Sequence, residues 1–337
     1  MRWGGQAGRE RKRALAMRQT WKPWFLVAIV GAGAASAAWW AREVGPGHAR
    51  SSMRPNERGR PWIILEDAGE VPTVYVGPLR LREALERGLV RPMALASADF
   101  DEDGMPDLVS GYAGPSGSLL TLHRGNAISL WPPSGGVRTG QAVGRSIVAP
   151  FWPEARVVAL PEPPDFLGAG DFDADGHADV ITAARGGRVL HLVRGDGRGG
   201  FQEQREIALP GQVTTLVVGE MNRADGLADI AVGIVARDGP HVLIFESPEG
   251  AVYGEPEPIP LPDEAMALAL GQLDERFEFD LAVAAGPDVL IVHGRDRYWG
   301  SSDHASALIS SIHRGQRSFV ALAVGDFLWD ETQGLEI

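Results

Sequence analysis

The sequence of 337 residues contains no cysteine, and lysine is absent after Lys22. The lack of cysteine excludes a disulfide framework, a thiolate metal site and a cysteine nucleophile. Residues 1–60 carry twelve basic against three acidic side chains, whereas residues 61–337 carry twenty arginines against 41 acids. A body this acidic argues against nucleic acid as a partner, because binding to phosphates depends on basic contacts. It is suited instead to binding cations.

The chain also lacks the common catalytic motifs. Its eight histidines are scattered singly, without an HExxH pattern or a pair at metal-binding spacing. Residues 195–200 match GxGxxG, but they lie between predicted strands and open no helix, which excludes a dinucleotide loop. We therefore expect no enzymatic activity from these residues.

The N-terminus combines a basic segment, residues 1–23, with an uncharged segment, residues 24–41. This order is typical of an export signal whose N-terminus stays inside the cell. The sequence Ala35-Ser36-Ala37 fits the cleavage site of a signal peptide. The length of the segment and the tryptophans at both of its ends suit a retained transmembrane anchor instead. We expect an exported chain that is membrane-anchored, or secreted or periplasmic if the signal is cleaved.

Two further segments precede the main body. Residues 42–60 are rich in Arg, Gly, Pro and Ser, which predicts a flexible linker. Residues 61–92 contain two apolar runs, 62–65 and 71–76, which predict a hairpin. The spacing from Leu79 to Val90 then predicts a short surface helix.

The most distinctive stretch is DFDADGHAD, residues 171–179, named loop 2 here. Its acidic side chains fall at positions 1, 3, 5 and 9, and Gly176 at position 6 suits a turn with positive φ. Carboxylates this close repel one another unless a cation lies between them, and oxygen ligands in this number suit Ca²⁺. The predicted ligands are the side chains of Asp171, Asp173, Asp175 and Asp179 and the carbonyl group of His177.

The pattern occurs a second time as DFDEDGMPD, residues 99–107, named loop 1. The predicted ligands are the side chains of Asp99, Asp101, Asp103 and Asp107 and the carbonyl group of Met105. An EF-hand loop would place a glutamate at its twelfth position, where this chain has Ser110 and Thr182. The short flanks also predict strands, so the EF-hand is excluded.

Weaker copies follow. Loop 3, residues 220–229, contains one inserted residue, which leaves its binding of an ion open. Its predicted ligands are Glu220, Asn222, Asp225 and Asp229. Loop 4, residues 272–280, has lost two acids and the glycine, and we predict no ion there. A fifth copy begins at Gly325, so the period is about 50 residues, lengthened once by an insertion near residues 131–153.

A period of about 50 residues with four short strands per unit predicts an all-β propeller. The units ALASADFDEDGMPDLV and FLGAGDFDADGHADVI resemble FG-GAP or VCBS-type repeats, the blades of integrin α-subunits and of many bacterial exported proteins. The resemblance covers residues 93–337 and implies Ca²⁺ in loops between the first and second strands of the blades. Family members commonly have seven blades, so we expect the sequence to continue beyond residue 337.

Fold analogy then implies a binding or adhesion module that holds a protein or glycan ligand on a face of the propeller. Two alternatives remain open. The propeller is a non-catalytic part of a larger extracellular enzyme, for example one that acts on polysaccharide, or it is a structural spacer that holds another domain away from the membrane.

Overall fold

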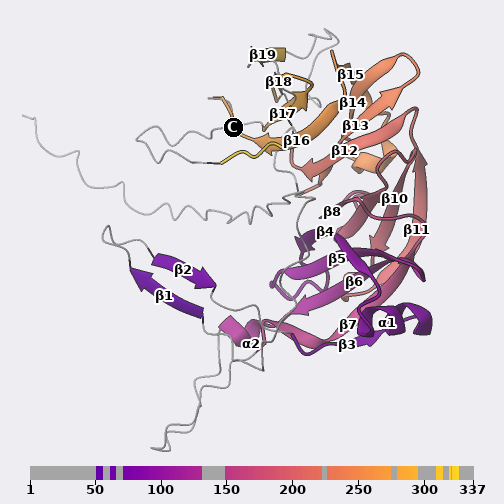
Figure 1. Ribbon diagram of the computed structural model, residues 1–337, viewed down its shortest axis with the longest axis vertical. Helices are drawn as coiled ribbons and strands as arrows, with labels where there is room; N and C mark the ends of the chain where they lie inside the picture. Colours follow the sequence, from indigo (N-terminus) through magenta and orange to yellow (C-terminus); the bar gives the residue numbers. More distant parts are fainter. Residues whose placement is uncertain are drawn as a thin grey trace, which may run out of the picture.

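The computed structural model arranges four small β-sheets one after another along an arc (Figure 1). The structure describes residues 51–55, 61–65, 71–130, 149–221, 226–274, 279–294, 309–313, 319 and 321–325. The predicted segments 1–23 and 24–41 lie outside these ranges. Within them, no helix has both the length and the apolar character needed to cross a membrane.

Blade 1 is a five-stranded sheet in the order β3-β7-β6-β5-β4. Its strands are β3 (Val74–Val76), β4 (Arg91–Ala98), β5 (Asp107–Gly114), β6 (Gly117–Gly125) and β7 (Phe151–Leu160). Strands β4 to β7 form an antiparallel meander, whereas β3 joins β7 in parallel. The extra length of this unit lies between β6 and β7, where the chain forms the short helix α2 (Ala127–Leu130).

The other three blades are four-stranded antiparallel meanders in chain order. Blade 2 contains β8 (Phe166–Gly170), β9 (Asp179–Ala183), β10 (Val189–Gly195) and β11 (Phe201–Ala208). Blade 3 contains β12 (Gln212–Gly219), β13 (Asp229–Ala236), β14 (Gly239–Phe245) and β15 (Glu257–Pro260), with the 3₁₀ helix η1 (Ala251–Tyr253) between the last two. Blade 4 contains β16 (Ala265–Gly271), β17 (Asp280–Ala285), β18 (Asp288–Val292) and β19 (Ile309–His313).

The first strands of the blades, β4, β8, β12 and β16, are neighbours in sequence order on the inner side of the arc (Figure 1). The predicted propeller arrangement is therefore confirmed for four blades, and the strand pattern anticipated for the second and third units is present. The second strands of blades 2 and 4 are mostly apolar, and every residue of β9 and β17 is buried. The outer strand β11, in contrast, is mostly polar and exposed.

Each hydrophobic core lies between two blades. Val109 and Leu122 of blade 1 belong to the same cluster as Val180 and Val193 of blade 2. Similar clusters join blade 2 to blade 3 and blade 3 to blade 4. A blade therefore gains most of its stability by covering the face of its neighbour.

The second residue of each of loops 1 to 3 fills these joints. Phe100, Phe172 and Met221 are at most 2% exposed. Phe100 belongs to blade 1, yet its ring packs edge-on against Phe201 of blade 2, with ring centroids 5.7 Å apart. The aromatic residue inside the acidic pattern is thus a wedge between neighbouring blades, a role that the sequence analysis did not assign.

A cap covers the other face of blade 1. It is helix α1 (Leu79–Glu86), whose Leu81 packs against Leu119 and Val157 of the blade. The predicted helix is confirmed, but it stops at Glu86 because Gly88 adopts a φ of +63°. The cap takes the position that a preceding blade would occupy.

The predicted hairpin between residues 62–65 and 71–76 is wrong. Strand β2 (Pro61–Leu65) pairs instead with β1 (Ser51–Pro55), which places a strand inside the predicted linker 42–60. The second apolar run provides β3, whose backbone pairs with the outer edge of β7. The outer edge of β7 offers backbone N–H and C=O groups that need hydrogen-bond partners. Strand β3 therefore pairs with this edge and not with β2, although β2 is nearer in sequence.

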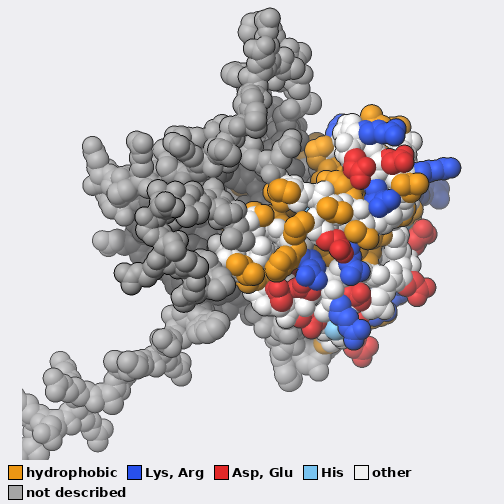
Figure 2. Space-filling view, turned by 90° about the horizontal axis from the view of Figure 1, so that it is seen from below, with side chains coloured by type: hydrophobic (Ala, Val, Ile, Leu, Met, Phe, Trp, Pro, Cys, Tyr) orange, Lys and Arg blue, Asp and Glu red, His pale blue; other side chains and the backbone are white. Residues whose placement is uncertain are grey.

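Figure 2 views the surface that lies at the bottom of Figure 1, where β3, β7 and α1 are drawn. A band of apolar side chains crosses a surface that otherwise mixes acidic and basic groups. The exposed apolar residues of these elements include Val74 (63%), Leu79 (59%) and Trp152 (37%). At the far end of the array, Phe319, Leu322 and Val324 pack against blade 4, just before the predicted start of the fifth copy.

Candidate metal centres

Loops 1 to 4 join the first and second strands of successive blades, and each ends in a buried aspartate that anchors it. In loop 2 this residue is Asp179, which is fully buried. Its Oδ2 accepts the N–H of Phe172 at 3.3 Å, and its Oδ1 accepts the N–H of Gly195 at 2.8 Å. The anchor thus ties the loop to the end of the third strand, β10. The same pair of contacts is made by Asp107 with Phe100 and Gly125, and by Asp280 with Leu273 and Gly294.

The residue that ends the third strand must be a glycine if its N–H is to reach the anchor aspartate. A Cβ on Gly195 would lie 2.0 Å from the carbonyl oxygen of Ala178. Only glycine therefore brings its N–H close enough to the anchor aspartate. The tripeptide Arg194-Gly195-Asp196 has the sequence of the RGD adhesion motif, but backbone packing alone accounts for the glycine at its centre.

Burial raises the pKa of both well-defined anchors. Removal from water raises the pKa of Asp179 to about 7 and that of Asp107 to about 6. Hydrogen bonds from backbone N–H groups act in the opposite direction, and nearby carboxylates add to the rise. Both groups are therefore charged only at a cost, which a nearby cation would reduce.

The rest of each loop folds as the predicted turn. Gly104 and Gly176, at position 6, adopt φ values of +85° and +87°. The first aspartate closes the turn, since Asp171 accepts the N–H of Gly176 at 2.9 Å and Asp99 accepts that of Gly104 at 2.9 Å. The loop is therefore organised by its own carboxylates, apart from any ion.

Three carboxylate oxygens in these loops are buried and have no hydrogen-bond partner among the described residues. They are Oδ1 of Asp101, Asp171 and Asp173. In each loop the acids converge: Asp99, Asp101 and Asp107 offer oxygens within 4.8 Å of one another, as do Asp171, Asp173 and Asp179. A buried carboxylate oxygen without a partner is destabilising, and a cation satisfies it. Loops 1 and 2 thus hold acidic groups that fit a metal ion.

The fit does not include every predicted ligand. Asp103 and Asp175 lie outside the converging groups, and each accepts a backbone N–H two residues further on. Coordination by the carbonyl groups of Met105 and His177 stays a prediction. In loop 3, Asn222 and Asp225 lie outside the described residues, while Asp229 is buried and accepts the N–H of Met221 at 2.7 Å. Glu220 precedes Met221 and forms no group with Asp229 within the described residues.

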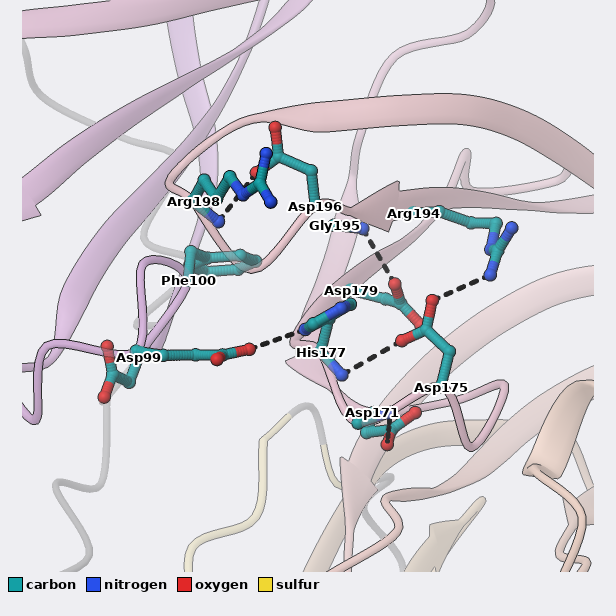
Figure 3. A network of polar contacts seen from close by, with 12 residues as sticks. Asp99, Phe100, Asp171, Asp175, His177, Asp179, Arg194, Gly195, Asp196 and Arg198 are labelled. Atoms are coloured by element: carbon teal, nitrogen blue, oxygen red, sulfur yellow. Dashed lines mark hydrogen bonds and ion pairs between the residues drawn. The ribbon is translucent and has the colours of Figure 1, made fainter.

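Two arginines that the sequence analysis did not select contact the loops from the ends of β6 and β10. Arg194 contacts Oδ2 of Asp173 and, at 2.7 Å, Oδ2 of Asp175 (Figure 3). Arg124 lies 3.2 Å from Oδ2 of Asp101. The available signal was the repetition of Arg-Gly after an apolar strand in both intact units.

Loop 4 brings together a different set of groups. His293 Nδ1 lies 3.1 Å from Asp274 Oδ2 and 3.4 Å from Asp280 Oδ1. These three residues converge as the acids of loops 1 and 2 do. The prediction that loop 4 holds no ion stays a prediction, but the loss of two acids there is accompanied by a histidine that pairs with those that remain.

The loops also connect the blades. His177 of loop 2 forms a hydrogen bond with Glu102 of loop 1, and Figure 3 shows its ring directed toward that loop. The N–H of Gly199, in the turn after β10, binds the carbonyl oxygen of Phe100 at 2.9 Å. A change in loop 1 or loop 2 therefore alters contacts between blades 1 and 2.

Residues 171–232, from loop 2 through the first half of β13, match the family model described as FG-GAP-like repeat. The chain contains an FG-GAP-like repeat. The matched region contains loop 2, its anchor Asp179 and the joint with blade 3.

Solved structures resemble the chain at low sequence identity. A chain in the crystal structure of BBS1N in complex with ARL6DN, soaked with mercury, is 15% identical, with a TM-score of 0.43 over 83% of this chain and 66% of that chain. The V. cholerae biofilm matrix protein Bap1 is 12% identical, with a TM-score of 0.28 over 60% of this chain and 38% of that chain. The chain therefore spans just under two thirds of the first and well under half of the second. No curated protein matches the sequence.

Proposed function

We propose that the chain is an exported binding module whose loops 1 and 2 hold Ca²⁺, and that the ion stabilises the joints between blades. The observation that carries this proposal is the set of buried Oδ1 atoms without partners on Asp101, Asp171 and Asp173. These oxygens lie in the two loops whose acids converge.

The chemistry of the donors favours Ca²⁺ over other metals. The converging groups of loops 1 and 2 consist of carboxylates and include no histidine or cysteine. Hard oxygen donors in a loop of irregular geometry suit Ca²⁺, whereas Mg²⁺ requires a stricter octahedron and Zn²⁺ prefers nitrogen and sulfur. Sites of this kind in extracellular modules bind with a Kd of about 10⁻⁴–10⁻³ M.

Thermal unfolding of the full-length chain with Ca²⁺, with Mg²⁺ and with chelator tests the proposal. We expect Ca²⁺ to raise the Tm, because a ligand that binds only the folded state stabilises it by about 2.7 kcal/mol at a hundredfold excess over Kd. Asp99→Ala and Asp171→Ala should each reduce the rise, and the double variant should abolish it. Asp238→Ala removes an exposed acid outside the loops and should leave the rise intact. If Ca²⁺ does not change the Tm of the wild type, the proposal is refuted.

The affinity for Ca²⁺ should also depend on pH. In the metal-free protein Asp179 has a folded pKa of about 7, above its ordinary value of 3.8. Its contribution to stability is thus fully present below 3.8 and is lost as pH rises through 7. A bound cation needs the carboxylate, so binding releases a proton and weakens as pH falls below 7. We expect roughly tenfold weaker binding at pH 6 than at pH 8, measured by calorimetry. Equal affinities would exclude Asp179 as an ion ligand.

The proposed location and partner of the module rest on analogy with FG-GAP repeats. FG-GAP repeats are typically extracellular, which agrees with an export signal in residues 24–41, whether it is cleaved or retained as a membrane anchor. The ligand is proposed to be a protein or glycan bound on a face of the propeller. The chain itself is proposed to be non-catalytic.

Incubation with a panel of purified polysaccharides separates this proposal from its alternatives. Retention of a polysaccharide on immobilised full-length chain, without release of new reducing ends, supports a binding module. Release of reducing ends would favour an enzyme, and a lack of retention for every polysaccharide and surface protein tested would favour a spacer. The assay is run with Ca²⁺ and repeated with chelator, because loss of retention in chelator would link the ligand face to the loops.

A further inference from the structure

In blades 1, 2 and 4, one residue near the end of the third strand contacts an acid of the loop between the first two strands. It directly precedes the residue that binds the anchor aspartate through its N–H. The residues at this position are Arg124, Arg194, Glu246 and His293 in blades 1 to 4. The two blades with an intact acidic loop are the two that carry an arginine.

Each arginine takes only one oxygen of the carboxylate that it contacts. Arg194 binds Oδ2 of Asp173, and Arg124 binds Oδ2 of Asp101. The other oxygen of each carboxylate, Oδ1, is buried and has no hydrogen-bond partner among the described residues. The side chains of Asp173 and Asp101 are 1% and 9% exposed, so water does not easily replace the missing partner.

This division orients the carboxylate at position 3. The guanidinium fixes Oδ2, and the second oxygen, Oδ1, is thereby held buried and free to bind a cation. In loop 2 the same guanidinium also binds Asp175, which holds two mutually repelling carboxylates with one positive charge. Without the arginine, the metal-free loop would contain only like charges.

We propose that Arg194, and Arg124 in blade 1, are positioning residues that stand in for the cation when it is absent and limit its affinity when it binds. The inference rests on the proposed function, because it concerns the same Ca²⁺ sites. The two effects have opposite signs. The arginine stabilises the metal-free loop by pairing with carboxylates, and it repels a divalent ion a few ångströms away.

Arg194→Gln is the decisive variant, since glutamine keeps hydrogen-bond donors and loses the charge. Its Tm in chelator should fall below that of the wild type. Its Ca²⁺ affinity should rise about tenfold, because one repulsive charge near the ion is removed. Arg194→Lys keeps the charge and should bind Ca²⁺ as the wild type does. Arg198→Gln makes the same charge change at an exposed position of the adjacent turn and should alter neither quantity.

The experiment measures Tm in chelator and Ca²⁺ affinity by calorimetry on the full-length chain, with Ca²⁺ as the only ligand. A lower Tm in chelator together with tighter binding in Arg194→Gln supports the inference, since a residue with a merely structural role would not tighten binding. If the wild type binds Ca²⁺ and Arg194→Gln binds it equally or more weakly, the inference is overturned while the proposed function stands. If the wild type does not bind Ca²⁺, the proposed function fails and the inference fails with it.

Discussion

Replacing Phe172 by alanine is expected to lower the free energy of unfolding by about 3–5 kcal/mol. The ring is fully buried in the cluster that joins blade 2 to blade 3. Its removal leaves a cavity between two sheets whose backbones are held apart by their own hydrogen bonds, so the site cannot collapse completely. Urea unfolding of the full-length chain, in saturating Ca²⁺, measures this loss.

The matched control is Tyr253→Ala, which removes an aromatic ring from the nearby helix η1. Tyr253 is 55% exposed and contacts the guanidinium of Arg205 at 5.0 Å from its ring centroid. Its removal should cost no more than about 1 kcal/mol. If both variants lost the same stability, Phe172 would not be a wedge between blades.

Asp179→Ala is expected to be nearly as destructive, lowering the free energy of unfolding by about 2–4 kcal/mol in chelator. The variant leaves the buried N–H groups of Phe172 and Gly195 without an acceptor, at about 1–3 kcal/mol each. Part of this cost is offset, because a buried carboxylate with a raised pKa is removed at the same time.

Asp171→Ala provides the comparison within the same loop. The side chain of Asp171 accepts the backbone N–H of Gly176 in an exposed part of the turn. Its loss should therefore cost about 1 kcal/mol in chelator, although it removes a predicted ion ligand just as Asp179→Ala does. Unfolding in chelator thus separates the two roles. Equal losses for both variants would show that Asp179 does not anchor the loop.

What the sequence predicts well is local. The spacing of acids and glycine in residues 99–107 and 171–179 predicts the turn, the flanking strands and the convergence of most carboxylates, because all of these depend on residues within one loop. The recurrence of that pattern then predicts the blades. A nine-residue turn with this pattern of aspartates and glycine can adopt few backbone conformations, so each copy of the pattern predicts the same turn.

What the sequence does not predict depends on neighbours from other blades or on distant strands. The burial of Phe100 against Phe201 and the ion pair of Arg194 with Asp173 each join residues that no local pattern connects. The wrong hairpin has the same origin: β3 pairs with β7, which lies about 75 residues later in the chain and is brought close only when blade 1 is complete. Proximity in sequence favours pairing of β3 with β2, whereas the folded blade offers β3 the free edge of β7.

The cap on blade 1 gives the array a direction during synthesis. Because α1 packs on the first face of this blade, that face is covered once β7 has left the ribosome. Each wedge, such as Phe100, belongs to one blade and is covered by the next. A growing chain therefore exposes a single unfilled joint at a time, always at its newest blade, which limits the apolar surface open to misassociation before the next repeat emerges.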